Sequence, residues 1–162
     1  MNDEKVTVQL RVNGQDQTVS VASNETLVTT LRREFGLTSV RTTCDIGICG
    51  VCTVLLDGLP VSGCLKLTAL CDGQEIITSE GLLEDGEMTD PVQLAFVENS
   101  AFQCSYCTPA MVLTARSLLK ENPTPDVGEI REYMAGNLCR CGSHPHVIEA
   151  VQSVASKVGG EG

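Results

Sequence analysis

The segment CDIGICGVC, residues 44–52, spaces three cysteines as C-x(4)-C-x(2)-C, and Cys64 follows a short distance along the chain. A [2Fe–2S] cluster needs four thiolate ligands, and this is the plant-type spacing. Gly47 and Gly50 let the loop pass close to a cluster and direct backbone N–H groups at its sulfurs. The segment therefore predicts an iron–sulfur site with the ligands Cys44, Cys49, Cys52 and Cys64.

A structural zinc site is the alternative for these four cysteines. Zinc ligands usually come as two close pairs, and a gap of four residues at the start of the set is unusual for them. The spacing therefore favours an iron–sulfur cluster over zinc at this site.

Segments typical of β-strands lie on both sides of the loop and predict β-hairpins. Residues 6–12 alternate between apolar and polar side chains, and Asn13-Gly14 leads to a second strand over residues 18–21. A second hairpin is expected over residues 51–61, turning at Asp57-Gly58, and a last short strand over residues 75–77.

One helix is expected between the two hairpins. Ser23 or Asn24 can cap a helix from about Glu25 to Phe35, and Gly36 is suited to end it. Strands around a single helix indicate a small α+β unit of the plant-ferredoxin (β-grasp) type.

The second half of the chain has a helical pattern. Asp90-Pro91, Thr108-Pro109 and Thr124-Pro125 each place an N-cap oxygen before a proline suited to the first helical turn. A fourth helix is expected over residues 145–158, where apolar residues recur at spacings of three and four. We therefore expect a ferredoxin-like domain at residues 1–80, an acidic linker at 81–90 and a four-helix domain at 91–162.

Four further cysteines lie in the helical half. Cys104 and Cys107 form C-x(2)-C, and Cys139 and Cys141 form C-x-C ahead of the last helix. Two such loops can converge on one metal site. On spacing alone, a zinc ion and an iron–sulfur cluster are equally good interpretations of this second site, because a C-x(2)-C pair with a second Cys pair is a normal zinc signature.

The bulk composition restricts the compartment and the partners. Nine cysteines in 162 residues, an odd number, are more consistent with metal ligation in a reducing cytoplasm than with structural disulfides. The formal charge of −10 argues against nucleic-acid binding. The sequence shows neither a leader with a basic and an apolar region nor an apolar run long enough for membrane insertion. We therefore expect a soluble, cytoplasmic protein.

Three longer strings resemble known signatures. CDIGICGVCTV (residues 44–54), QCSYCTPAM (103–111) and GNLCRCG (136–142) resemble the iron–sulfur subunit of the xanthine oxidase family, the molybdenum hydroxylases. The resemblance extends from Val6 to about Val154. It implies one [2Fe–2S] cluster in each domain, which favours iron over zinc at the second set of cysteines, and a separate small subunit of the bacterial type.

The resemblance also implies cofactors, partners and site residues. Cys104, Cys107, Cys139 and Cys141 would hold the cluster nearest molybdenum, with Gln103 and Cys141 against the pterin. The first four cysteines would hold the outer cluster. The partners would be a large subunit binding molybdopterin cytosine dinucleotide and a medium FAD subunit or a cytochrome acceptor, in a hetero-oligomer such as a dimer of heterotrimers. This chain would pass electrons and catalyse no bond chemistry itself.

Two departures from the family pattern do not involve a ligand. Thr42-Thr43 precedes Cys44, where relatives often carry a glycine-containing pair. GSHPHV follows Cys141, where many relatives have threonine, glycine and tyrosine. The second departure is similar to relatives that oxidise N-heteroaromatic compounds, some of which deliver electrons to a cytochrome.

Some residues fall outside both ligand sets. Cys71 is the ninth thiol and is expected to be a small buried residue. His144 and His146 are expected to be loop residues. Two other functions remain open at this point: a stand-alone ferredoxin, which would not need the helical domain, and a zinc-stapled interaction module, which would be colourless.

Overall fold

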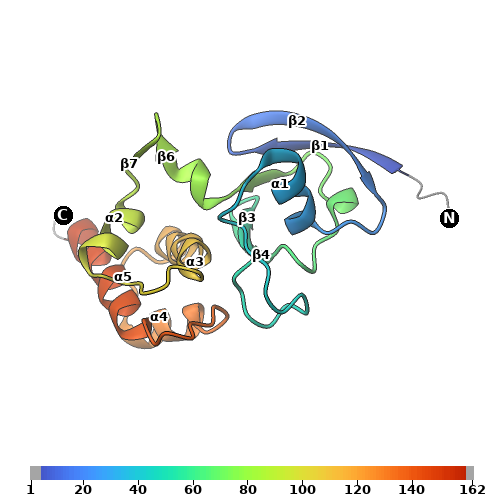
Figure 1. Cartoon of the computed structure of the whole chain (residues 1–162). Helices are drawn as coiled ribbons and strands as arrows, with labels where there is room; N and C mark the ends of the chain where they lie inside the picture. Colours follow the sequence, from blue (N-terminus) through green and yellow to red (C-terminus); the bar gives the residue numbers. More distant parts are fainter. Residues whose placement is uncertain (1–4, 160–162) are drawn as a thin grey trace.

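The structure is a computed structural model that describes residues 5–159. A five-stranded sheet with helix α1 forms one half of the molecule, and helices α2–α5 pack together in the other half (Figure 1). No helix in the described range is long and apolar enough to cross a membrane. The elements, in chain order, are β1 (Lys5–Val12), β2 (Gln15–Ala22), α1 (Leu27–Phe35), β3 (Thr53–Leu56), β4 (Leu59–Ser62), η1 (Thr68–Leu70), β5 (Glu75–Ile77), η2 (Ser79–Leu82), β6 (Leu83–Glu84), β7 (Glu87–Met88), α2 (Pro91–Glu98), α3 (Thr108–Glu121), α4 (Val127–Met134) and α5 (His144–Gly159).

The predicted α+β class and both predicted hairpins are confirmed. The strands of the large sheet run in the order β2-β1-β5-β3-β4, with β1 and β5 parallel and the other pairs antiparallel. Asn13 and Gly14 have φ values of 49° and 78° at the first turn, and Asp57 and Gly58 have 50° and 85° at the second. Two consecutive positive φ values give the turn the twist that a two-residue hairpin needs.

Helix α1 begins later than the sequence predicted. Its N-cap is Thr26, whose side chain makes no capping hydrogen bond, so the expected caps Ser23 and Asn24 were wrong. Thr26 forms a β-bridge with Leu67, and the N–H of Leu27 donates to the carbonyl of Lys66 at 2.7 Å. Tertiary pairing therefore sets the start of this helix, while Gly36 ends it with a φ of 65°, as predicted.

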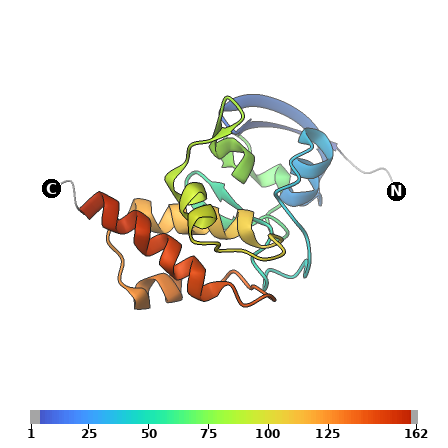
Figure 2. The same ribbon diagram turned by 60° about the vertical axis from the view of Figure 1, so that its left-hand side comes forward.

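Strand β3 is shared between two apolar cores. All four of its residues are buried. Val54 and Leu56 join the core between the sheet and α1, whereas Leu55 belongs to the core of helices α2–α5. Figure 2 shows α3 lying beside the end of the sheet that β3 and β4 form. Because successive side chains of a strand point to opposite faces, this one strand connects the two halves.

The segment expected to be a linker contains β-structure that the sequence pattern did not predict. Strands β6 and β7 pair through Leu83 and Met88, and Asp85-Gly86 forms the turn with φ values of 50° and 82°. The prediction that β-structure ends before residue 81 was therefore wrong. Residues 1–4 and 160–162 of the expected domains lie outside the described residues.

The predicted helix starts were right in part. Asp90 caps α2 as expected. Helix α3 begins at Thr108 with Cys107 as its N-cap, so Thr108 is a helical residue and not the cap. The predicted start at Thr124-Pro125 was wrong, because Asp126 caps α4 in a capping box with Glu129.

Asp90→Ala is expected to lower the free energy of unfolding by about 2 kcal/mol. The buried Asp90 carboxylate accepts hydrogen bonds from the N–H groups of Val92 and Gln93 and pairs with Arg116 Nε at 2.9 Å. Its loss would leave these donors without their acceptor at the start of α2. Urea denaturation would measure the change, and Glu121→Ala, an exposed change, should alter it by less than about 0.5 kcal/mol.

Candidate metal centres

The first set of predicted ligands lies where the sheet meets the helical half. Cys44, Cys49 and Cys52 lie on the loop between α1 and β3, and Cys64 follows β4. The β3–β4 hairpin brings Cys64 back beside Cys52, because Thr53 pairs with Ser62 and the N–H of Gly63 donates to the Cys52 carbonyl at 3.2 Å. A local hairpin therefore unites ligands that are separated in sequence.

Backbone N–H groups surround the most exposed thiol of this loop. The N–H groups of Ile46 and Cys49 point at Cys44 Sγ and lower the pKa of its thiol to about 6. The N–H of Cys49 lies 3.4 Å from that sulfur. Positive φ values at Asp45 and Gly47 (52° and 75°) turn the loop so that these groups face inward. Such a loop stabilises a thiolate, which is the form that ligates metal.

The other three thiols of this ligand set, those of Cys49, Cys52 and Cys64, are buried. Burial, together with the neighbouring Cys64 and Cys49 thiols, raises the pKa of the Cys52 thiol to about 11. The four sulfurs therefore approach in two pairs, Cys44 with Cys49 and Cys52 with Cys64.

The second set of predicted ligands is also brought together. Cys104 and Cys107 precede α3, and Cys139 and Cys141 lie between α4 and α5. The thiol of Cys104 interacts with that of Cys141, and the thiol of Cys107 interacts with that of Cys139. Two loops more than thirty residues apart therefore form one site, again as two pairs of thiols.

The electrostatics of this second site resemble those of the first. Burial and the neighbouring Cys139 thiol raise the pKa of Cys107 to about 12. Burial also opposes ionisation of Cys139, but N–H groups outweigh it and lower the pKa of that thiol to about 7. The N–H of Ser143 lies 3.4 Å from Cys139 Sγ. The N–H of Tyr106 lowers the pKa of Cys104.

The paired arrangement fits a dinuclear cluster. In a [2Fe–2S] core, two thiolates bind each iron, so four sulfurs in two pairs are what such a core requires. A mononuclear zinc site needs all its ligands around one point. The arrangement therefore favours iron–sulfur clusters at both sites.

The remaining residues singled out in the sequence lie in different surroundings. Gln103 is exposed, and its Nε2 donates to the carbonyl of Cys141 at 3.0 Å, so the two predicted pterin-facing residues are in contact. Cys71 is fully buried in the core under α1 and donates to the carbonyl of Leu67 at 3.4 Å. His146 pairs with Glu149 at 3.2 Å. Both His144 and His146 lie in α5, so the prediction that they are loop residues was wrong.

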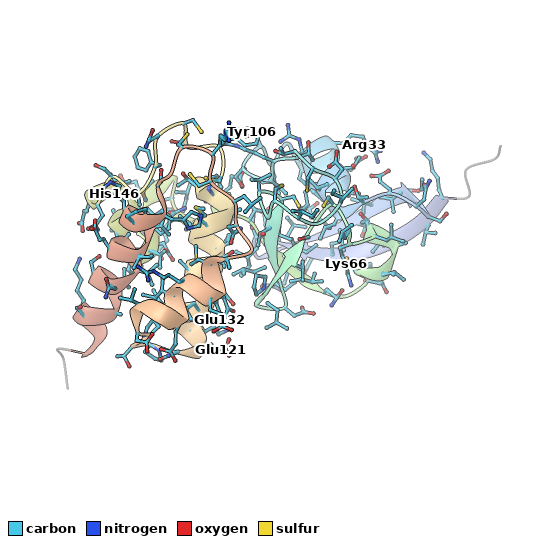
Figure 3. All side chains as sticks on the ribbon, turned by 90° about the horizontal axis from the view of Figure 1, so that it is seen from below. Arg33, Lys66, Tyr106, Glu121, Glu132 and His146 are labelled. Atoms are coloured by element: carbon cyan, nitrogen blue, oxygen red, sulfur yellow. The ribbon has the colours of Figure 1, made fainter. Side chains whose placement is uncertain are left out.

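Sequence reasoning missed the contacts that hold the two sites together. Arg41 Nη1 donates to the carbonyl of Ser105 at 2.5 Å, and its guanidinium lies 5.0 Å from the centre of the Tyr106 ring. The Tyr106 hydroxyl donates to the carbonyl of Thr42 at 2.8 Å. Figure 3 shows Tyr106 near the end of the helical half that faces away from Glu121. No local pattern in the sequence indicates these contacts.

Comparison with known proteins supports both sites. Residues 10–79 match the family described as "2Fe-2S iron-sulfur cluster binding domain", and residues 78–152 match "[2Fe-2S] binding domain". The chain is 45% identical to the nicotinate dehydrogenase small FeS subunit of Eubacterium barkeri, covering 91% of this chain and 94% of that protein. It is 40% identical to the nicotine 6-hydroxylase small subunit of Paenarthrobacter nicotinovorans, covering 96% and 93%.

Solved structures share the fold over most of the chain. Quinoline 2-oxidoreductase from Pseudomonas putida 86 matches with a TM-score of 0.89 and 40% identity, covering 93% of each chain. The aldehyde oxidoreductase from Desulfovibrio desulfuricans matches with a TM-score of 0.90 and 35% identity over 96% of this chain. That match covers only 17% of the second protein, so the chain corresponds to a small part of a longer polypeptide there.

Proposed function

This chain belongs to the small iron–sulfur subunits of the xanthine oxidase family of molybdenum hydroxylases, and from this premise we propose its ligands, its partners and its place in the complex. It is a non-catalytic electron-transfer subunit of an oxidoreductase of this type. Bound [2Fe–2S] clusters supply one-electron transfer, and the chain supplies their ligands, orientation and electrostatic surroundings. The observation that carries this function is the pairwise approach of eight thiols in two sites lined by backbone N–H groups.

The ligand assignment follows from the two sets of thiols. An outer cluster is held by Cys44, Cys49, Cys52 and Cys64, and an inner cluster by Cys104, Cys107, Cys139 and Cys141. The pKa values of Cys44 and Cys139, about 6 and about 7, support thiolates at these positions near neutral pH. Cys71 lies outside both sets, in an apolar core.

The inner site faces a partner subunit in this proposal. Gln103, Cys104 and Tyr106 are exposed, so the chain alone does not shield this end of the site from water. A large subunit that holds molybdopterin cytosine dinucleotide would cover them, with Gln103 and Cys141 against the pterin. The relatives are small subunits by name, which supports a complex with other chains.

Further components of the complex are also proposals. The acceptor for the outer site is a medium FAD subunit or a cytochrome, in a hetero-oligomer that can be a dimer of heterotrimers. The location in this proposal is the cytoplasm, because a reducing compartment keeps eight ligating thiols from forming disulfides. The substrate of the complex is an N-heteroaromatic compound, because nicotinate, nicotine and quinoline stand in the names of relatives that are 40–45% identical. Turnover assays with nicotinate, quinoline and an aldehyde would compare these substrate classes.

The metal content tests the function directly. The purified chain is expected to hold about four iron and four acid-labile sulfide, with two distinguishable paramagnetic signals after reduction. The two signals should differ because one site is built on the β3–β4 hairpin and the other on helix termini. Elemental analysis, sulfide assay and EPR spectroscopy would measure this. Two iron plus one zinc per chain would contradict the assignment of the inner site.

A further inference from the structure

The two cysteine loops touch each other through the residues that follow α4. The N–H of Leu138 donates to the carbonyl of Cys49 at 2.9 Å. Leu138 directly precedes Cys139, so this hydrogen bond joins the neighbour of one proposed ligand to another proposed ligand of the other cluster. The outer-cluster loop (residues 44–52) and the inner-cluster loop (residues 136–141) are therefore linked by backbone.

The side chain of Asn137 adds a second link between these loops. Asn137 is 3% exposed, and its Nδ2 donates to the carbonyl of Gly50 at 2.9 Å. That carbonyl also accepts from Thr53 Oγ1 at 2.7 Å and from the N–H of Thr53 at 3.2 Å. Three donors on one buried carbonyl fix its position, because breaking any of them in a low-dielectric setting is costly.

The approach of the loops leaves no room for a side chain. A Cβ at Gly50 would lie 2.1 Å from the carbonyl oxygen of Gly136, and Gly50 has a φ of 68°. Both the backbone conformation and the contact therefore require glycine there. The contact between Gly50, Gly136 and Asn137 is called the loop clamp below.

We propose that Asn137 is a positioning residue, which holds the outer-cluster loop against the inner-cluster loop and thereby sets the electronic coupling between the two clusters. This inference rests on the proposed ligand assignment. Asn137 is not a ligand, and it acts through the loop clamp and the hydrogen bond between Leu138 and Cys49. Without its Nδ2, the Gly50 carbonyl loses the donor that comes from the other half of the molecule.

Asn137→Ala in the full chain, with both clusters reduced, tests the proposal. The spin–spin interaction between the two reduced clusters, seen as splitting of their EPR signals, is expected to weaken or disappear while iron content stays at the wild-type level. Ser117→Ala is the matched control. Ser117 Oγ also donates across the two halves, to the carbonyl of Gly58 at 3.3 Å, but away from both cysteine loops. The EPR splitting of the Ser117→Ala protein should equal that of the wild type.

Asn137→Ser is the milder variant if the alanine protein loses iron, because its hydroxyl keeps a shorter donor. It should weaken the splitting in the same direction. An Asn137 variant that keeps its full iron content and shows the EPR splitting of the wild type would overturn the proposal. Loss of iron from both Asn137→Ala and Asn137→Ser would also overturn it, because Asn137 would then have a purely structural role. If the wild-type chain itself fails to hold four iron, the ligand assignment fails first, and the two failures are distinguishable.

Discussion

Cys49→Ser is expected to remove the outer cluster, about half of the bound iron, and to destabilise the half of the molecule built on β1–β5. A loop that lacks its own regular structure between residues 36 and 52 depends on the bound metal for its fold. A serine hydroxyl is a poor substitute for a thiolate because it does not ionise near neutral pH. Iron analysis would show the loss of about half of the iron, and EPR spectroscopy would show the loss of one of the two cluster signals. Urea denaturation would show a lower free energy of unfolding.

Cys71→Ser is the matched control for this change. Cys71 is buried and donates only to the carbonyl of Leu67 among the side-chain contacts in the described chain. A serine can make the same hydrogen bond, so iron content should stay unchanged and the free energy of unfolding should fall by about 1 kcal/mol. Loss of iron from the Cys71 variant, or full iron in the Cys49 variant, would mean that the ligands are assigned wrongly.

The elements that the sequence predicted well are those encoded by neighbouring residues. Asn13-Gly14 and Asp57-Gly58 need two consecutive positive φ values, which few other residue pairs allow, so both hairpins could be located from the sequence. Gly36 ended α1 for the same local reason. Asp90 before Pro91 was sufficient to locate the start of α2.

The elements that it predicted poorly depend on distant partners or on competing caps. Helix α1 begins at Leu27 because Thr26 pairs with Leu67, a contact that no local pattern encodes. Asp126 with Glu129 formed a capping box two residues after the predicted start at Thr124, and this stronger cap determined where α4 begins. The β6–β7 hairpin has the turn Asp85-Gly86, but its strands are too short for an alternating pattern to be recognised.

The cysteine sites show the same division. Their spacing predicted which thiols belong together, and the structure brings each set into one place, although their role as cluster ligands stays a prediction. The contacts between the two sites could not be predicted. Arg41 with Tyr106, and Asn137 with Gly50, are separated by more than sixty residues and arise only when the helical half docks on the sheet.

Gln103→Ala is expected to slow electron transfer into the clusters of the assembled complex by at least about tenfold, because small displacements at a site of electron or group transfer are costly. Gln103 Nε2 ties the loop before α3 to the carbonyl of Cys141 on the loop before α5. Its loss would free both loops at the face where the pterin is proposed to lie. Iron content should not change, because Gln103 is not a ligand.

Stopped-flow reduction by substrate, followed at the cluster absorbance, would measure this rate. Glu121→Ala is the control, since Glu121 is exposed at the end of α3 and lies away from Tyr106 (Figure 3). Size-exclusion chromatography would establish that both variants still assemble with the large subunit. A Gln103 variant that assembles, keeps its iron and is reduced as fast as the wild type would place the pterin elsewhere, because a residue in contact with Cys141 and the pterin could not be removed without a change in this rate.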